Sequence, residues 1–207
     1  AYAYNLSGYN SCDVLSYDGA GCGTPPEVVA AYHVDDHVYE KLFAYTVPHS
    51  LGHIYGTTTN RLFGNKSAGL EGKTMGLAPY GNPNPHMTMM VHDEENDMYV
   101  ATYPSTTKLL YKGVEPFASL FGLRQENIKQ RERKPWDFDD PTDKAYADLA
   151  ASAQKSIEAA GLFYVNKLKK ITNEKNLCLT GGVALNSCLN GLIRRKNTYE
   201  KTFAPSG

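Results

Sequence analysis

Apolar residues recur at spacings of three and four along 142–171, which predicts one long amphipathic helix. The residues on this apolar face are Ala150, Ala153, Ile157, Ala160, Tyr164, Leu168 and Ile171. A short apolar run over 176–180 then predicts a buried strand, and a pair of glycines separates it from a second predicted helix over 183–195. A further strand is predicted over 199–203. Helix, strand, helix and strand in this order are typical of an α/β sheet.

The first part of the chain shows shorter patterns of the same two kinds. They predict the last turns of a helix over 1–7, a strand over 14–17, a hairpin from the β-rich runs 28–33 and 37–45, and helices over 51–62 and 71–77. Gly8 suits a left-handed helix cap. Residues 82–140 are punctuated by prolines, and we interpret them as an irregular insertion.

Composition narrows the class of protein. The 207 residues suffice for one large domain or two small lobes, and 21 Lys and Arg against 22 Asp and Glu leave a net charge of -1. This balance predicts neither a nucleic acid nor an anionic membrane as partner. Cys12, Cys22, Cys178 and Cys188 form no CxxC pair, and no secretory signal is found, so we expect reduced thiols and a cytoplasmic protein.

The glycine pair Gly181-Gly182 stands where a strand gives way to a helix. Glycines there let the main chain approach a ligand closely, and a helix start offers free amide donors, so a nucleotide phosphate or ribose fits. A tight turn without a ligand explains the same spacing equally well. Asn186 and Asn190 lie one turn apart on the predicted helix. Their side chains either face the same cleft or are ordinary polar residues on the surface.

Two other segments carry candidate chemistry. Asp18 ends a predicted strand beside Gly19, where it can bind a cation or simply form an Asp-Gly turn. The segment from Glu71 to Gly81 packs three glycines and one proline into eleven residues, which a plain surface helix does not need. Glu71 can bond a sugar hydroxyl, and Lys73 can meet a phosphate or pair with a carboxylate.

The histidines give weaker indications. His33 and His37 flank the predicted hairpin turn, where a metal site is the less favoured interpretation. His49 and His53 have the four-residue spacing of helical metal ligands, but no third ligand lies near them in sequence.

Four motifs occur in an order that resembles the O-carbamoyltransferase family, which includes nodulation and antibiotic-tailoring enzymes. The motifs are PHSLGHIY at 48–55, EGKTMGLAPYG at 71–81, AASAQ at 150–154 with Glu158, and LCLTGGVALNSCLN at 177–190. The resemblance implies a Kae1-like domain of the actin/Hsp70 ATPase type, with an RNase H-like fold. The resemblance also implies two lobes. The first lobe comprises about residues 1–81, and the second, nucleotide-binding lobe comprises residues 141–207.

The resemblance also implies an activity. A YrdC-like domain, absent here, would make carbamoyl-adenylate from ATP and carbamoyl phosphate, and the Kae1-like domain would pass the carbamoyl group to a hydroxyl of a small molecule in a biosynthetic reaction. Asp18 would hold a divalent cation, iron or a similar ion. Glu71, Lys73, Gly181, Gly182 and Asn186 would line the nucleotide cleft, and no residue is assigned a catalytic step.

The resemblance predicts further features of the chain as a whole. Both ends read as cuts in a longer protein, because a histidine motif and an aspartate of the expected metal site are missing, so we expect little or no transfer by the 207 residues alone. A homodimer is compatible with the family. The alternatives are a tRNA threonylcarbamoyl-transferase of the same fold, against which the EGKTMGLAPYG segment argues, and a non-enzymatic actin-like nucleotide-binding module.

Overall fold

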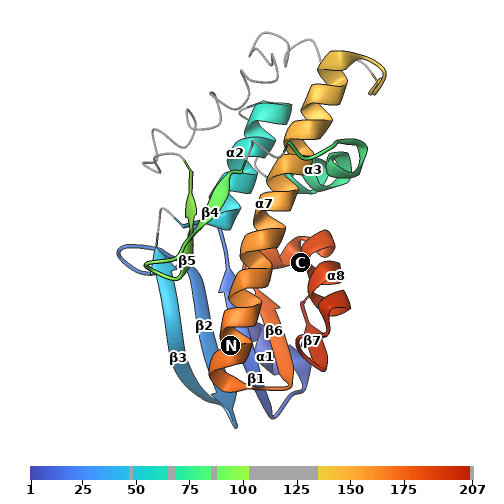
Figure 1. Cartoon of the computed structure of the whole chain (residues 1–207). Helices are drawn as coiled ribbons and strands as arrows, with labels where there is room; N and C mark the ends of the chain where they lie inside the picture. Colours follow the sequence, from blue (N-terminus) through green and yellow to red (C-terminus); the bar gives the residue numbers. More distant parts are fainter. Residues whose placement is uncertain (47–48, 65–68, 85–87, 103–134, 206–207) are drawn as a thin grey trace. The chain divides into compact units, whose positions relative to one another are not determined.

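The computed structural model describes residues 1–46, 49–64, 69–84, 88–102 and 135–205. The chain divides into two units. Figure 1 labels their helices and strands. The first unit comprises Ala1–Gly52, Asp93–Met98 and Glu158–Gly207, and the second comprises His53–His92 and Tyr99–Ile157. Each unit is described by itself.

A five-stranded sheet forms the centre of the first unit. Its strands are β1 (Ser11–Tyr17), β2 (Glu27–Asp35), β3 (Val38–Thr46), β6 (Asn176–Thr180) and β7 (Lys201–Phe203). They lie in the order β3-β2-β1-β6-β7, antiparallel from β3 to β1 and parallel from β1 to β7. The predicted α/β class is therefore confirmed, with a mixed sheet.

Short elements cover this sheet or connect its strands. Helix α1 (Tyr2–Ser7) ends at Gly8, whose φ of 71° confirms the predicted left-handed cap. Ala3 and Tyr4 of this helix pack in a buried cluster with residues of three strands. The predicted hairpin is also confirmed, since β2 and β3 pair around a turn in which Asp36 and His37 have φ of 43° and 64°.

The long predicted helix is confirmed as α7 (Pro141–Thr172), which carries residues of both units. In contrast, the predicted single helix over 183–195 is wrong in its first turn. A 3-10 turn, η2 (Gly182–Leu185), comes first, Asn186 follows in an extended conformation, and α8 (Ser187–Lys196) begins after it.

The second unit is mainly helical. It holds most of α2 (Leu51–Phe63), together with α3 (Glu71–Leu77), a 3-10 turn η1 (Ala78–Tyr80) and the first half of α7. The helices predicted over 51–62 and 71–77 are thus confirmed. The Thr59 and Thr74 hydroxyls lie 2.8 Å apart and join α2 to α3, and the Tyr55 hydroxyl donates to Gln154 Oε1 on α7 at 2.8 Å.

Strands β4 (Met90–Asp93) and β5 (Met98–Ala101) pair as a separate two-stranded sheet. They lie within 82–140, the range interpreted as an irregular insertion, of which 85–87 and 103–134 fall outside the described residues. Within the part of the chain that the structure describes, no helix has the length and apolar character needed to cross a membrane.

Candidate functional site

The carboxyl ends of two neighbouring parallel strands bring Asp18 and the glycine pair together. Strands β1 and β6 pair in register, with Ser16 opposite Thr180. Asp18 is the first residue after β1, and Gly181 is the first residue after β6. Parallel strands end at the same edge of a sheet, which is where ligands bind in open α/β sheets. The sequence predicted both turns, and the pairing of β1 with β6 makes them neighbours.

Both glycines of the pair lie where a side chain does not fit. Gly181 has a φ of 87°, and a Cβ built on it would lie 2.9 Å from the carbonyl carbon of Tyr17. A Cβ on Gly182 would lie 2.9 Å from Asp18 Oδ1. The main chain of the 181–182 turn therefore runs directly beside the Asp18 carboxylate, and Gly182 is exposed there.

The Asp18 turn is fixed from several sides. Asp18 Oδ1 accepts a hydrogen bond from the Gly19 amide at 2.7 Å. The Ser50 hydroxyl lies 2.9 Å from the Asp18 carbonyl oxygen and 2.7 Å from that of Gly19, and it can donate to either. A Cβ on Gly52 would lie 2.7 Å from the Asp18 carbonyl carbon, so the start of α2 packs closely against this turn. The carboxylate is half-buried and held in one orientation.

The two asparagines shape the turn after β6. Asn186 is 7% exposed, and its side-chain oxygen accepts from the Leu189 amide at 2.9 Å, so it caps α8. The Asn190 side-chain amide donates to the Ala184 carbonyl at 2.7 Å. These contacts hold the 3-10 turn that Gly182 begins. Asn186 was expected to contact a nucleotide, and in the structure its side chain supports this turn and caps α8.

Glu71 and Lys73 belong to the second unit, whereas Asp18, Gly181, Gly182 and Asn186 belong to the first. Glu71 is the first residue of α3, and its Oε1 lies 3.7 Å from the position of a Cβ on Gly56. Lys73 is exposed, with its amino group 5.9 Å from the centre of the Phe63 ring.

The glycines around these two residues differ in their surroundings. A Cβ on Gly81 would lie 2.6 Å from the Asp148 amide nitrogen, so α7 excludes a side chain there. Gly72 and Gly76 have nothing within 4 Å of that position. Packing against neighbouring elements therefore explains Gly81 but not Gly72 or Gly76.

The described residues contain no group of three or more His, Cys, Asp or Glu side chains that could hold a metal ion. Asp18 supplies one oriented carboxylate, and its expected role as a metal ligand stays a prediction. His33, by contrast, is engaged by a protein carboxylate, since its Nδ1 lies 3.0 Å from Asp13 Oδ1. We therefore derive no chemical step through a cation.

Sequence reasoning missed Asp13, a fully buried carboxylate on β1. Besides the His33 contact, its Oδ2 accepts from the hydroxyls of Thr172 at 2.5 Å and Tyr199 at 2.6 Å. Burial, and next the hydrogen bond to Asp13, raise the pKa of Tyr199. The available signal was an acidic residue within the apolar run Cys12 to Leu15. Asp13 joins β1 to the end of α7 and to the residues before β7, which is a structural role.

Exposed main chain, an oriented carboxylate and a missing side chain thus coincide at one sheet edge. Such a surface accepts a ligand that lies flat against the backbone and presents a hydroxyl or a cation to Asp18. A bare phosphate beside this carboxylate would be repelled, so an anionic ligand here needs a positive partner.

Known proteins resemble this chain over most of its length. The family model described as the carbamoyltransferase N-terminus matches residues 1–206. The nodulation protein NolNO of Sinorhizobium fredii is 27% identical over 215 residues, covering 97% of this chain and 26% of the relative. The uncharacterized protein sll1178 of Synechocystis sp. is 32% identical over 162 residues, covering 75% of this chain and 24% of the relative.

A third relative is the nodulation protein NolO of Bradyrhizobium diazoefficiens, 25% identical over 203 residues, which cover 97% of this chain and 33% of the relative. The chain thus spans between 24% and 33% of the length of these relatives.

Proposed function

The chain belongs to the carbamoyltransferase N-terminus family, and on that premise we propose that it forms part of an ATP-dependent O-carbamoyltransferase. The complete enzyme takes the carbamoyl group of carbamoyl phosphate, passes it through carbamoyl-adenylate, and delivers it to a hydroxyl of a small molecule. The fold proposed for the transferase region is the actin-like type, with a Kae1-like arrangement of the sheet.

One observation supports this proposal most directly, namely the contact between the 181–182 turn and Asp18. A Cβ on Gly182 would reach within 2.9 Å of Asp18 Oδ1, so the two strand ends form a surface of main chain and one carboxylate. An adenylate can lie against such a surface because no side chain stands in the way. Glu71 and Lys73, which belong to the second unit, stay predicted nucleotide-binding residues.

In the proposed reaction, the carbamoyl group moves from the adenylate to the acceptor in one displacement. The hydroxyl oxygen of the acceptor attacks the carbamoyl carbon, the bond from that carbon to the adenylate oxygen breaks, and AMP leaves while the hydroxyl proton passes to water. Main-chain amides beside the glycine turn stabilise the negative charge that develops on the carbonyl oxygen. Asp18 orients the reacting group by accepting a hydrogen bond from a hydroxyl. If a divalent cation binds, Asp18 is the residue that would hold it, and the cation would supply Lewis-acid polarisation.

The test compares two substitutions in the complete protein. Asp18→Asn keeps the acceptor for the Gly19 amide and removes the negative charge, whereas Asp36→Asn makes the same change in the exposed β2–β3 turn. We expect Asp18→Asn to reduce carbamoyl transfer by at least about a hundredfold while pyrophosphate release from ATP continues, and Asp36→Asn to leave both unchanged. Equal transfer by the two variants would reject the role of Asp18.

A second substitution addresses the nucleotide. Gly182→Ala places a methyl group against the Asp18 carboxylate, and we expect weaker ATP binding, measured by calorimetry. Urea denaturation of the same variant measures the accompanying loss of stability. If the parent protein binds ATP but does not consume carbamoyl phosphate, the proposed function fails and the non-enzymatic nucleotide-binding module takes its place. If the parent protein does not bind ATP, both fail.

A further inference from the structure

Three aromatic rings of the second unit stack in nearly parallel planes. The centres of the Tyr80 and Phe138 rings lie 4.6 Å apart at an interplanar angle of 12°, and those of Phe138 and Trp136 lie 6.0 Å apart at 10°. Tyr80 is nevertheless 59% exposed and Trp136 36% exposed. Flat apolar faces that stack on one another and still meet solvent present a surface to which another flat ring can be added.

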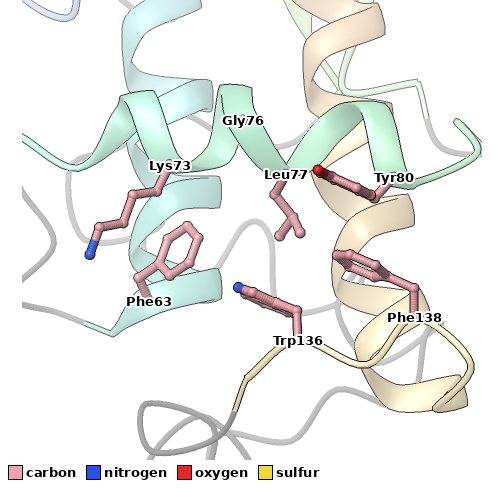
Figure 2. Close-up of a pocket in the computed structure, with 7 residues that line it drawn as sticks. All are labelled: Phe63, Lys73, Gly76, Leu77, Tyr80, Trp136 and Phe138. Atoms are coloured by element: carbon pink, nitrogen blue, oxygen red, sulfur yellow. The ribbon is translucent and has the colours of Figure 1, made fainter.

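These rings line a pocket with a volume of about 390 Å³. Figure 2 shows the pocket between α3, the end of α2 and the segment before α7. Its lining residues are Phe63, Lys73, Gly76, Leu77, Tyr80, Trp136 and Phe138. All of them belong to the second unit, and the volume lies within the range of small-molecule sites, about 300–1,000 Å³.

One wall of the pocket is open because α3 carries a glycine there. A Cβ on Gly76 would meet nothing within 4 Å, so neither packing nor backbone strain requires glycine at this position. A larger side chain would instead project toward the space that the pocket provides. The absence of a side chain at Gly76 is explained if a ligand passes close to the helix.

Lys73 gives the pocket its charge. It is the one ionisable side chain among the seven lining residues apart from the Tyr80 phenol. Its amino group lies beyond the Phe63 ring at the edge of the pocket (Figure 2), 5.9 Å from the ring centre. An ammonium group at the edge of an apolar pocket attracts an anionic group of a ligand whose ring lies inside.

We propose that this pocket binds a small molecule that combines a flat aromatic ring system with a single anionic group. The ring lies against the Trp136 and Phe138 faces, and the anion meets the Lys73 ammonium. The single ammonium group of Lys73 matches one negative charge on a ligand, whereas a nucleoside triphosphate needs several positively charged groups. All the pocket residues lie in the second unit, so the proposal uses neither Gly181 nor Gly182. It assigns Lys73 to this ligand in place of the nucleotide contact expected for that lysine.

Three matched probes test the chemistry of the pocket by calorimetry on the intact chain. Naphthalene-2-sulfonate has the ring and the charge, naphthalene-2-sulfonamide has the ring without the charge, and cyclohexanesulfonate has the charge without the flat ring. We expect the first to bind most tightly. Lys73→Met should weaken the sulfonate about threefold to tenfold and leave the sulfonamide unchanged. Phe138→Leu should weaken both naphthalene probes by roughly tenfold.

The controls separate this site from others. Lys155→Met removes the charge of an exposed lysine on α7 that does not line the pocket, and it should change no affinity. Trp136 is the single tryptophan of the chain, so its one indole N–H resonance must shift when naphthalene-2-sulfonate binds. Circular dichroism establishes that each variant is folded.

Several results would overturn the proposal. They are no binding of naphthalene-2-sulfonate at millimolar concentration, equal weakening by Lys73→Met and Lys155→Met, or binding that leaves the Trp136 resonance unmoved. Displacement of naphthalene-2-sulfonate by AMP would assign the pocket and Lys73 to the nucleotide, and it would overturn the proposal. Failure of ATP binding with intact naphthalene-2-sulfonate binding would count only against the proposed function.

Discussion

Two glycines of the first unit have a positive φ, with ψ of 16° at Gly8 and 168° at Gly181, and they differ in their surroundings. Gly8 has a φ of 71° and nothing within 4 Å of the position that a Cβ would occupy, whereas the same position on Gly181, with a φ of 87°, meets the main chain of Tyr17. Gly8→Ala should therefore lower the free energy of unfolding only by the strain of placing a side chain at a positive φ, about 1–2 kcal/mol. Gly181→Ala adds a steric overlap that no flexible side chain can relieve.

We expect the free energy of unfolding to fall by about 3 kcal/mol or more for Gly181→Ala. Urea denaturation of the two alanine variants beside the parent chain measures both effects. A Gly181→Ala variant as stable as Gly8→Ala would show that the strand ends are not packed as closely as the structure has them.

Tyr199 links stability to alkaline pH. Burial and the hydrogen bond to Asp13 raise its pKa, so the folded chain retains the phenolic proton where the unfolded chain has lost it. The stabilisation is complete below the unfolded pKa of about 10 and is lost as the pH rises above that value. Tyr199→Phe should lower the free energy of unfolding by about 1.5–3 kcal/mol at pH 7, because a hydrogen bond to a charged group is removed.

Above about pH 10, the difference between Tyr199→Phe and the parent chain should narrow, because the variant has no proton to lose at this position. Chemical denaturation at pH 7 and at pH 10.5 measures the change. Tyr2, which is 67% exposed, provides the matched control, since Tyr2→Phe should alter stability at neither pH. A gap that widens with pH would contradict the assignment.

Helix α8 depends on one side chain at its start. Asn186 accepts a hydrogen bond from the Leu189 amide at 2.9 Å and leaves the helical conformation, with φ of -74° and ψ of 96°. Asn186→Ala removes this acceptor and should destabilise the chain by about 1 kcal/mol, whereas Asn186→Asp keeps an acceptor and should be nearly neutral. Thermal unfolding of the two variants compares them, and equal losses would show that the cap contributes nothing.

The α3 segment contains a second matched pair of glycines. Gly81 packs against the main chain of α7 near Asp148, whereas Gly72 lies within the helix with open space around it. Gly81→Ala should destabilise the chain by several kcal/mol, and Gly72→Ala should stabilise it by about 0.5–1 kcal/mol through helix propensity. Opposite shifts of the urea midpoint are the expected result, and shifts of the same sign would contradict the packing at Gly81.

Periodicity predicted the elements well where each is one uninterrupted pattern. The apolar face of α7 and the run that forms β6 are both read directly from the sequence. The break at Asn186 was missed because its cause is a local hydrogen bond, which leaves the apolar spacing almost unchanged. Pairing of β1 with β6, which brings Asp18 beside Gly182, joins residues far apart in sequence and leaves no signal in either pattern.

The same reasoning explains the uneven prediction of the site. Glycine turns after strands were recognisable because few residue types tolerate close backbone contact. The Asp13 cluster was not recognisable, because its partners come from β2, from the end of α7 and from the segment before β7. The Trp136 pocket was missed as well, since rings that stack on one another are spread over 80–138 without a common period.

Over the whole molecule, charge distinguishes the proposed function from its nearest alternative. A tRNA-modifying transferase must hold a polyanion, which requires an excess of Lys and Arg on one surface. This chain has 21 basic and 22 acidic residues. A local basic group at the end of α8, Arg194, Arg195 and Lys196, is placed to interact with the negative end of that helix, and Glu200 lies with the two arginines in the same pocket wall.

We therefore expect no measurable binding of tRNA below about 10 μM at physiological salt, within the range typical of non-specific association. Fluorescence anisotropy with labelled tRNA at 50 and 150 mM salt measures this directly. Any complex seen at the lower salt should disappear at the higher one, and Arg194→Glu with Arg195→Glu should weaken it, because both arginines belong to the basic group at the end of α8. Submicromolar affinity at 150 mM salt would favour the tRNA threonylcarbamoyl-transferase class, since a nearly neutral chain reaches such affinity only through specific contacts.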